Sequence, residues 1–132
     1  MKRTLKSARN PVWANKDQTA IDVLVVFEEI PEELPFTATP NDTHEHGRNL
    51  YAEILAGNYG EIAPYPEARE AANIRFIRGE LLLALDAIVS NPLRWASFSQ
   101  ETQQAYTVYR QALLDVPQQA GFPWNVTWPT KP

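Results

Sequence analysis

The most metal-like group of side chains in the sequence is Asp42, His44, Glu45 and His46. Imidazole nitrogens and carboxylate oxygens are ordinary zinc ligands, and two histidines share one face of a helix when they lie three or four residues apart. These two histidines are two residues apart, so on a predicted helix their side chains point about 200° away from each other. We therefore expect a polar helix start here, with no metal and no cofactor.

Other catalytic patterns are missing from the sequence. Glu28-Glu29 and Glu32-Glu33 are adjacent carboxylates in a Pro-containing turn, whereas a glycosidase needs two carboxylates facing each other across a cleft. The chain has no Cys, which excludes a disulfide framework, a thiolate zinc site and a cysteine nucleophile. The five Gly are scattered and form no phosphate loop, and no nucleophile-elbow motif accompanies the two histidines. We therefore expect no enzymatic activity.

The residues best suited to binding are the aromatic ones near the C-terminus. Phe122, Trp124 and Trp128 lie within a short segment that also holds Pro123 and Pro129. Such a segment is expected to be extended, near polyproline II geometry, with aromatic anchors projecting from it. Each Trp can bury roughly 150 to 250 Å². Two interpretations stay open: the segment folds back over the preceding helices and completes a core, or it docks on a partner.

Composition and charge limit the class of protein further. The chain has 132 residues, 44% of them hydrophobic, and a net charge of −4. Residues 1–16 carry five basic and no acidic side chains, residues 17–70 carry a local charge of −10, and the remainder carries +1. The acidic middle disfavours nucleic acid, and no apolar run is long enough for a membrane span or a signal core. We expect a soluble protein whose basic arm is disordered, docked, or laid on an acidic partner.

The apolar patterning predicts an α+β fold. Residues 20–27 form a β-branched, apolar strand, and residues 36–39 form a short edge strand after a turn, which together make a small β-hairpin. A helix begins near Asp42, which forms a capping box with Glu45, and ends at Gly57.

The second half of the sequence predicts an antiparallel helical hairpin. One helix spans residues 67–89 and is stopped by Asn91-Pro92, and Ser99 caps a second over residues 100–116. The facing apolar stripes are Leu81, Leu85 and Ile88 on the first helix and Tyr109, Leu113 and Val116 on the second. The predicted organisation is a basic arm (1–16), an acidic hairpin plus helix (17–66), the helical hairpin (67–119) and an extended aromatic tail (120–132), called the strap below.

The C-terminal motifs resemble those of a known family. The motifs are Tyr109-Arg110-Gln111-Ala112-Leu113, Asp115-Val116-Pro117, Gly121-Phe122-Pro123, Asn125-Val126 and Trp128-Pro129-Thr130-Lys131-Pro132. As a set they resemble the end of phage tail assembly chaperone proteins, which are close in pattern to tail-fibre assembly proteins of bacteriophages. The chain departs from the family pattern where Arg94, in place of an acid, precedes Trp95, and where Leu114, in place of Arg, follows Leu113. These departures could indicate a changed partner surface.

The resemblance implies a binding protein that acts in phage assembly. We expect a chaperone that binds a tail fibre protein, at its C-terminal region, or another tail or baseplate protein, and assists folding or attachment. It would work in the host cytoplasm, and its retention in the virion stays open. The alternative is a permanent structural adaptor of the tail or baseplate without a folding role. We assign partner binding to Tyr109, Arg110, Phe122, Pro123, Trp124, Trp128 and Pro129.

Overall fold

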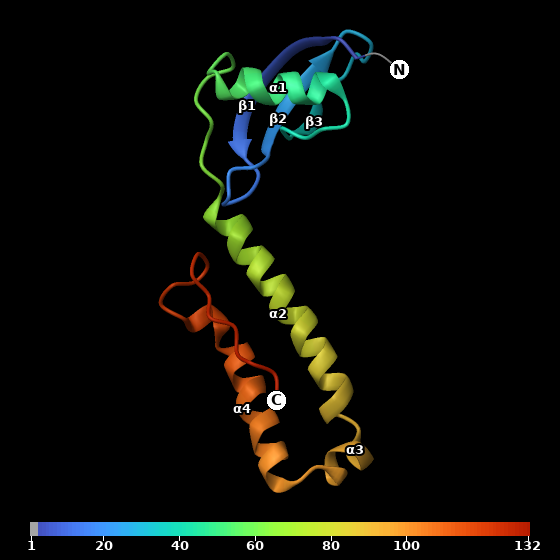
Figure 1. Ribbon diagram of the computed structural model, residues 1–132, viewed down its shortest axis with the longest axis vertical. Coiled ribbons are helices and arrows are strands. Elements are labelled where there is room, and N and C mark those ends of the chain that lie inside the picture. The colour runs from blue at the N-terminus through green and yellow to red at the C-terminus, as the bar shows by residue number, and fades with distance from the viewer. Residues whose placement is uncertain (1–2) are drawn as a thin grey trace. The chain divides into compact units, whose positions relative to one another are not determined.

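The computed structural model describes residues 3–132 and has the predicted α+β fold (Figure 1). The chain divides into two compact units, Met1–Tyr65 (unit 1) and Pro66–Pro132 (unit 2). In chain order the elements are β1 (Leu5–Trp13), β2 (Ile21–Phe27), β3 (Leu34–Ala38), α1 (Glu45–Leu55), α2 (Glu67–Val89), α3 (Pro92–Ser97), α4 (Gln100–Leu114) and a 3₁₀ turn (Val116–Gln118). Over the described residues, none of the helices combines the length and the apolar character that a membrane crossing requires.

Unit 1 is an antiparallel sheet with strand order β1-β2-β3 and one face packed on α1. Every second residue of β2 is buried, from Ile21 to Phe27, as the period of two in a half-covered strand requires. α1 covers this face with Leu50, Tyr51 and Ile54. The predicted hairpin is therefore present, and β3 is its edge strand.

The third strand of this sheet lies in the predicted basic arm. Leu5–Trp13 forms β1 and pairs antiparallel with β2, so these residues are neither disordered nor an arm laid on a partner. The strand was missed because its alternation is broken by register shifts, one of them around Asn10, which has a φ of 57°. The basic side chains Lys6 and Arg9 lie on this edge strand, where charge discourages pairing with other chains. Residues 1 and 2 of the predicted arm lie outside the described residues.

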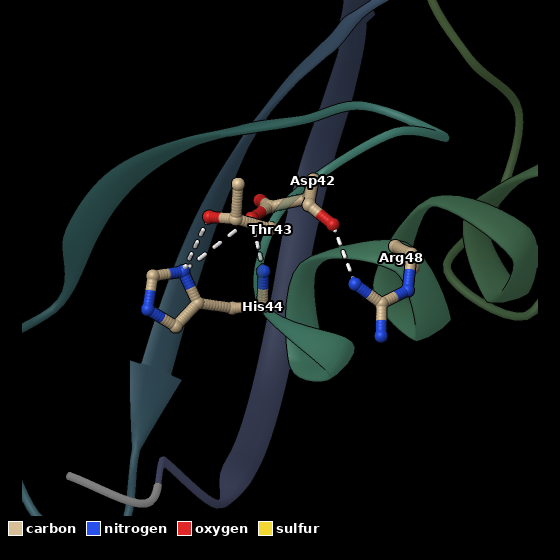
Figure 2. A network of polar contacts seen from close by, with 4 residues as sticks. All are labelled: Asp42, Thr43, His44 and Arg48. Atoms are coloured by element: carbon tan, nitrogen blue, oxygen red, sulfur yellow. Dashed lines mark hydrogen bonds and ion pairs between the residues drawn. The ribbon is translucent and has the colours of Figure 1, made fainter.

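The start of α1 differs from the predicted capping box. His44, not Asp42, is the N-cap residue, and it makes no side-chain cap. Asp42 instead closes a turn, because its Oδ1 accepts the His44 backbone N–H at 2.8 Å, while Arg48 donates to the Asp42 carbonyl at 2.6 Å (Figure 2). A Cβ at position 47 would collide with the Asp42 carboxylate, which explains Gly47. The predicted helix end is confirmed, since Gly57 follows with a φ of 88°.

Unit 2 is the predicted antiparallel helical hairpin, with α4 returning beside α2 (Figure 1). Its core is Leu85 of α2 against Tyr109 and Leu113 of α4, with Leu81 packed beside them. Val116 is also buried, but it lies outside this cluster. The predicted seam is therefore confirmed for Leu81, Leu85, Tyr109 and Leu113, whereas Ile88 and Val116 lie outside the cluster and Val89 packs against it instead.

Two polar caps shape the connection between α2 and α4. Asn91 accepts the backbone N–H groups of Leu93 and Arg94, so Asn91-Pro92 both ends α2 and begins α3. The sequence prediction treated this dipeptide only as a stop and missed α3. The predicted Ser99 cap of α4 is confirmed by its bond from the Thr102 N–H, at 3.1 Å.

Leu85→Ala is expected to cost roughly 2 to 5 kcal/mol of unfolding free energy, because it leaves a cavity in the α2–α4 seam. Leu83→Ala is the matched control two residues away, since Leu83 is exposed and its loss should change stability by less than about 0.5 kcal/mol. Urea unfolding monitored by circular dichroism measures both. Equal losses in the two variants would contradict this packing.

Candidate functional site

The two histidines lie together, contrary to the sequence prediction. Their ring centroids are 5.3 Å apart, because His44 has an extended backbone and precedes the helix, so the helical rotation does not separate them. The His46 ring packs edge-on against Phe27 at 5.7 Å and lies 6.0 Å from Phe36. Among the described residues, no group of three or more His, Cys, Asp or Glu is arranged to hold a metal ion.

His46→Ala is expected to destabilise unit 1 modestly, because it removes ring packing against Phe27 and Phe36. His44→Ala is the control, since His44 is exposed and should be close to neutral. Thermal melting compares the two variants, and elemental analysis of the wild-type protein should find no stoichiometric zinc. Zinc that is lost in both variants would show that the histidines are ligands.

The paired carboxylates of the β2–β3 turn have structural roles. Arg9 binds both oxygens of Glu33 at 2.7 and 2.8 Å, and this hydrogen bonding lowers the pKa of the Glu33 carboxyl. Glu29 accepts the Thr4 backbone N–H at 2.9 Å, which lowers the Glu29 pKa. Both carboxylates therefore tie the turn to β1, and they are not arranged across a cleft.

The strap begins with a closed loop instead of an extended segment. The Gln119 side chain binds the Thr127 backbone twice, donating to its carbonyl at 2.8 Å and accepting its N–H at 2.9 Å. Inside this loop the Asn125 N–H donates to the Gly121 carbonyl at 2.7 Å, and a Cβ on Gly121 would collide with the Asn125 carbonyl. Within the strap, residues 126–132 are the part without turns or helices, so the predicted extended geometry applies to these residues alone.

Three of the predicted partner-binding residues lie largely inside unit 2. Tyr109 is 6% exposed, and Pro123 is buried. Trp128 is half-buried and packs on the cluster of Leu85, Tyr109 and Leu113. The strap thus folds back over the helical hairpin and adds to its core, which is the first of the two interpretations that the sequence left open.

The other predicted residues are closer to the surface. Arg110 forms an ion pair with Asp86 at 3.1 Å in which both side chains are almost half exposed, so it is already paired within the chain. The Arg75 guanidinium lies 5.1 Å from the centre of the Phe122 ring, a cation–π contact. Trp124 is 38% exposed.

Pro129 lines a groove between α4 and the end of the strap. The groove has a volume of about 670 Å³. Its walls are Ala105, Val108, Tyr109 and Ala112 of α4 and Pro129–Pro132 of the strap, with Glu101 and Gln104 at the helix side. Small and proline side chains dominate it, so it offers an apolar surface and no catalytic constellation.

A second hollow lies at the α3 end of the helical hairpin. It measures about 160 Å³ and is lined by Val89, Trp95, Tyr106, Thr107, Arg110 and Gln111. Beside it, Phe98 stacks on Tyr106 at 5.4 Å. Arg110, which is paired with Asp86, is one of the residues that line this hollow.

Both hollows lie within residues 71–132, which match the family model described as phage tail assembly chaperone protein. These 62 residues, slightly less than half of the chain, are similar to that family. The match covers most of α2, all of α3 and α4, and the strap, whereas unit 1 lies outside it. No curated protein and no solved structure matches the chain. This similarity supports a role in phage tail assembly for residues 71–132, which we call the chaperone region below.

Several surface residues of the chaperone region were not found from the sequence. Ala105, Val108 and Ala112 recur at steps of three and four on α4, directly beside the buried stripe. Ala105 and Ala112 were predicted to belong to the apolar stripe that faces the other helix, and Val108 was not assigned, but Ala105 and Val108 are exposed. Their value as a binding surface depends on the strap, whose return over α4 forms the other wall.

Gln119→Ala is expected to loosen the end of the strap, because two hydrogen bonds to Thr127 are lost at about 1 kcal/mol each. Amide hydrogen exchange should speed up in residues 126–132 and stay unchanged in α2. Gln118→Ala is the control, because Gln118 is exposed. Unchanged exchange in Gln119→Ala would show that the clamp does not hold the strap.

Proposed function

We propose that the chain is a tail-fibre assembly chaperone, a binding protein without enzymatic activity. It binds a phage tail fibre protein, at the fibre's C-terminal region, and assists its folding or its attachment in the host cytoplasm. The support is the family of residues 71–132 together with the apolar surface that these residues expose.

The exposed apolar surface is the observation that carries this proposal. Large apolar side chains are exposed on α2, α3, α4 and the strap, and these are Phe76, Leu83, Leu93, Val108 and Trp124. Phe76 and Leu83 lie seven residues apart on α2 and therefore share one face of the helix, and grouped exposed apolar side chains are characteristic of interaction sites. The basic and acidic side chains of unit 2 balance, so the whole net charge of −4 lies in unit 1. An apolar binding unit is thus joined to a charged one that favours solubility.

A folding fibre presents the kind of surface that such a unit can cover. Fibre trimers expose β edges and apolar seams before their chains are fully paired, and such surfaces aggregate. A small protein that covers them reversibly needs exposed apolar side chains and no catalytic group. The chaperone is released, or retained in the virion, according to how much of this surface the finished fibre still offers.

Co-expression with the tail fibre protein of the same phage tests the proposal. We expect the chain to raise the yield of soluble fibre trimer, and mass spectrometry of purified virions then reports whether it is retained. Binding to finished trimer without any gain in yield would support a permanent structural adaptor instead. No binding at all would refute both functions.

Two tryptophan variants connect this function to the strap. Trp124→Ala should reduce the gain in soluble fibre and lower the melting temperature less than Trp128→Ala, because Trp124 is the most exposed aromatic side chain of the strap. Trp128→Ala is the contrasting variant and should destabilise unit 2, because it removes packing against Leu85 and Leu113. The assays are soluble trimer yield and thermal melting. A stable Trp128→Ala protein, or an unchanged yield with Trp124→Ala, would contradict these roles.

A further inference from the structure

The side of α2 turned away from the α4 seam is apolar and exposed. Ala72, Phe76, Gly79, Leu83 and Ala87 follow one another at steps of four, three, four and four residues, and all are exposed. At about 100° per residue they form one stripe, roughly opposite Leu85. We call these five residues the outer stripe. Phe76 and Leu83 are 67% and 69% exposed.

An outer stripe of this kind needs a cover. Apolar residues lie on two sides of α2, with charged residues such as Arg75, Asp86 and Glu80 between them, and α4 covers only the side that carries Leu85. Exposed apolar side chains that share one face are characteristic of an interaction site. We propose that the outer stripe binds an amphipathic α-helix of the partner protein, about four turns long, with a basic residue opposite Glu80. The inference deepens the proposed function and rests on it for the identity of the partner.

The spacing and the side-chain sizes favour a helix as the occupant. The steps of three and four match the repeat with which two helices interlock. Gly79 lies between Phe76 and Leu83, and a Cβ placed there would meet nothing within 4 Å. This open notch can receive a large side chain from the facing helix. From Ala72 to Ala87 the stripe is about 22 Å long, which sets the length of the partner helix.

Area and charge argue against a second copy of the chain as the occupant. A stripe of about 22 Å by 10 Å covers far less than the roughly 800 Å² per partner that stable complexes bury. A two-fold axis near Gly79 would also place Glu80 against its own copy. The Glu80 side chain is exposed, and it forms no hydrogen bond or ion pair with the part of the chain that the structure describes. A facing Lys or Arg would complement it, and the small area suits a transient complex.

The test uses the full chain and two labelled synthetic peptides of three heptads. Both peptides carry Leu at positions a and d, and one has Lys at e and g where the other has Glu. Fluorescence anisotropy should show at least about tenfold tighter binding of the Lys peptide. Glu80→Lys should reverse this preference. Equal binding of both peptides, or an unchanged preference in Glu80→Lys, would overturn the proposal.

Three further variants separate binding from folding. In Gly79→Gln the new side chain enters open space, so the melting temperature of this variant should equal or exceed that of the wild type. The same side chain would block the facing helix, so affinity for the Lys peptide should fall about tenfold. Leu83→Gln should weaken binding similarly. Leu55→Gln is the control, because Leu55 is 51% exposed but lies on α1 of unit 1. Equal weakening by Leu55→Gln would indicate non-specific hydrophobic binding and overturn the proposal.

The state of association gives the remaining outcome. Light scattering at micromolar concentration should report a monomer, and a dimer abolished by Leu83→Gln would assign the stripe to a second copy and overturn the proposal. Peptide binding is independent of the co-expression assay. A failure of fibre rescue with intact, charge-dependent peptide binding would therefore refute the fibre chaperone function and leave the helix-binding stripe standing.

Discussion

The apolar seam between α2 and α4 is the interaction on which the rest of unit 2 depends. Leu85, Tyr109 and Leu113 form its buried centre, and Trp128 from the strap packs against them. Because the seam holds α4 in place, it also fixes the helix on which the strap lies and forms the groove beside it. Binding surface and stability are thus coupled, since the residues that close the core also position the exposed apolar side chains around it.

The two units divide the physical tasks of the protein. Unit 1 completes its own core from a three-stranded sheet and α1, and it carries the net negative charge. Unit 2 has no net charge and leaves large apolar side chains exposed. The proposed chaperone function would use both properties, because apolar surface supplies affinity and charge opposes self-association. Unit 1 lies outside the family match, so its contribution to recognition is a separate question from that of residues 71–132.

Regular elements could be predicted from the sequence where one physical pattern dominated. The strand at residues 21–27 and the helix at 67–89 follow from β-branched alternation and from a long apolar period with a Pro stop. β1 could not be found, because the break around Asn10 interrupts its alternation. In the candidate site, Trp128 packs on the core because the strap folds back over the helical hairpin. Short-range sequence patterns do not predict such a long-range contact. The outer stripe was not predicted, because the apolar period was assigned to the one face that carries Leu81 and Leu85, and Leu83 was not assigned to any face.

We propose that unit 2 binds the fibre protein through exposed apolar side chains, and hydrogen exchange of the full chain is the direct test. Exchange is measured by mass spectrometry with and without the tail fibre protein of the same phage. We expect added protection in α2 and at the end of the strap, with unit 1 little changed. Protection confined to unit 1, or none in a mixture where binding is independently shown, would contradict it.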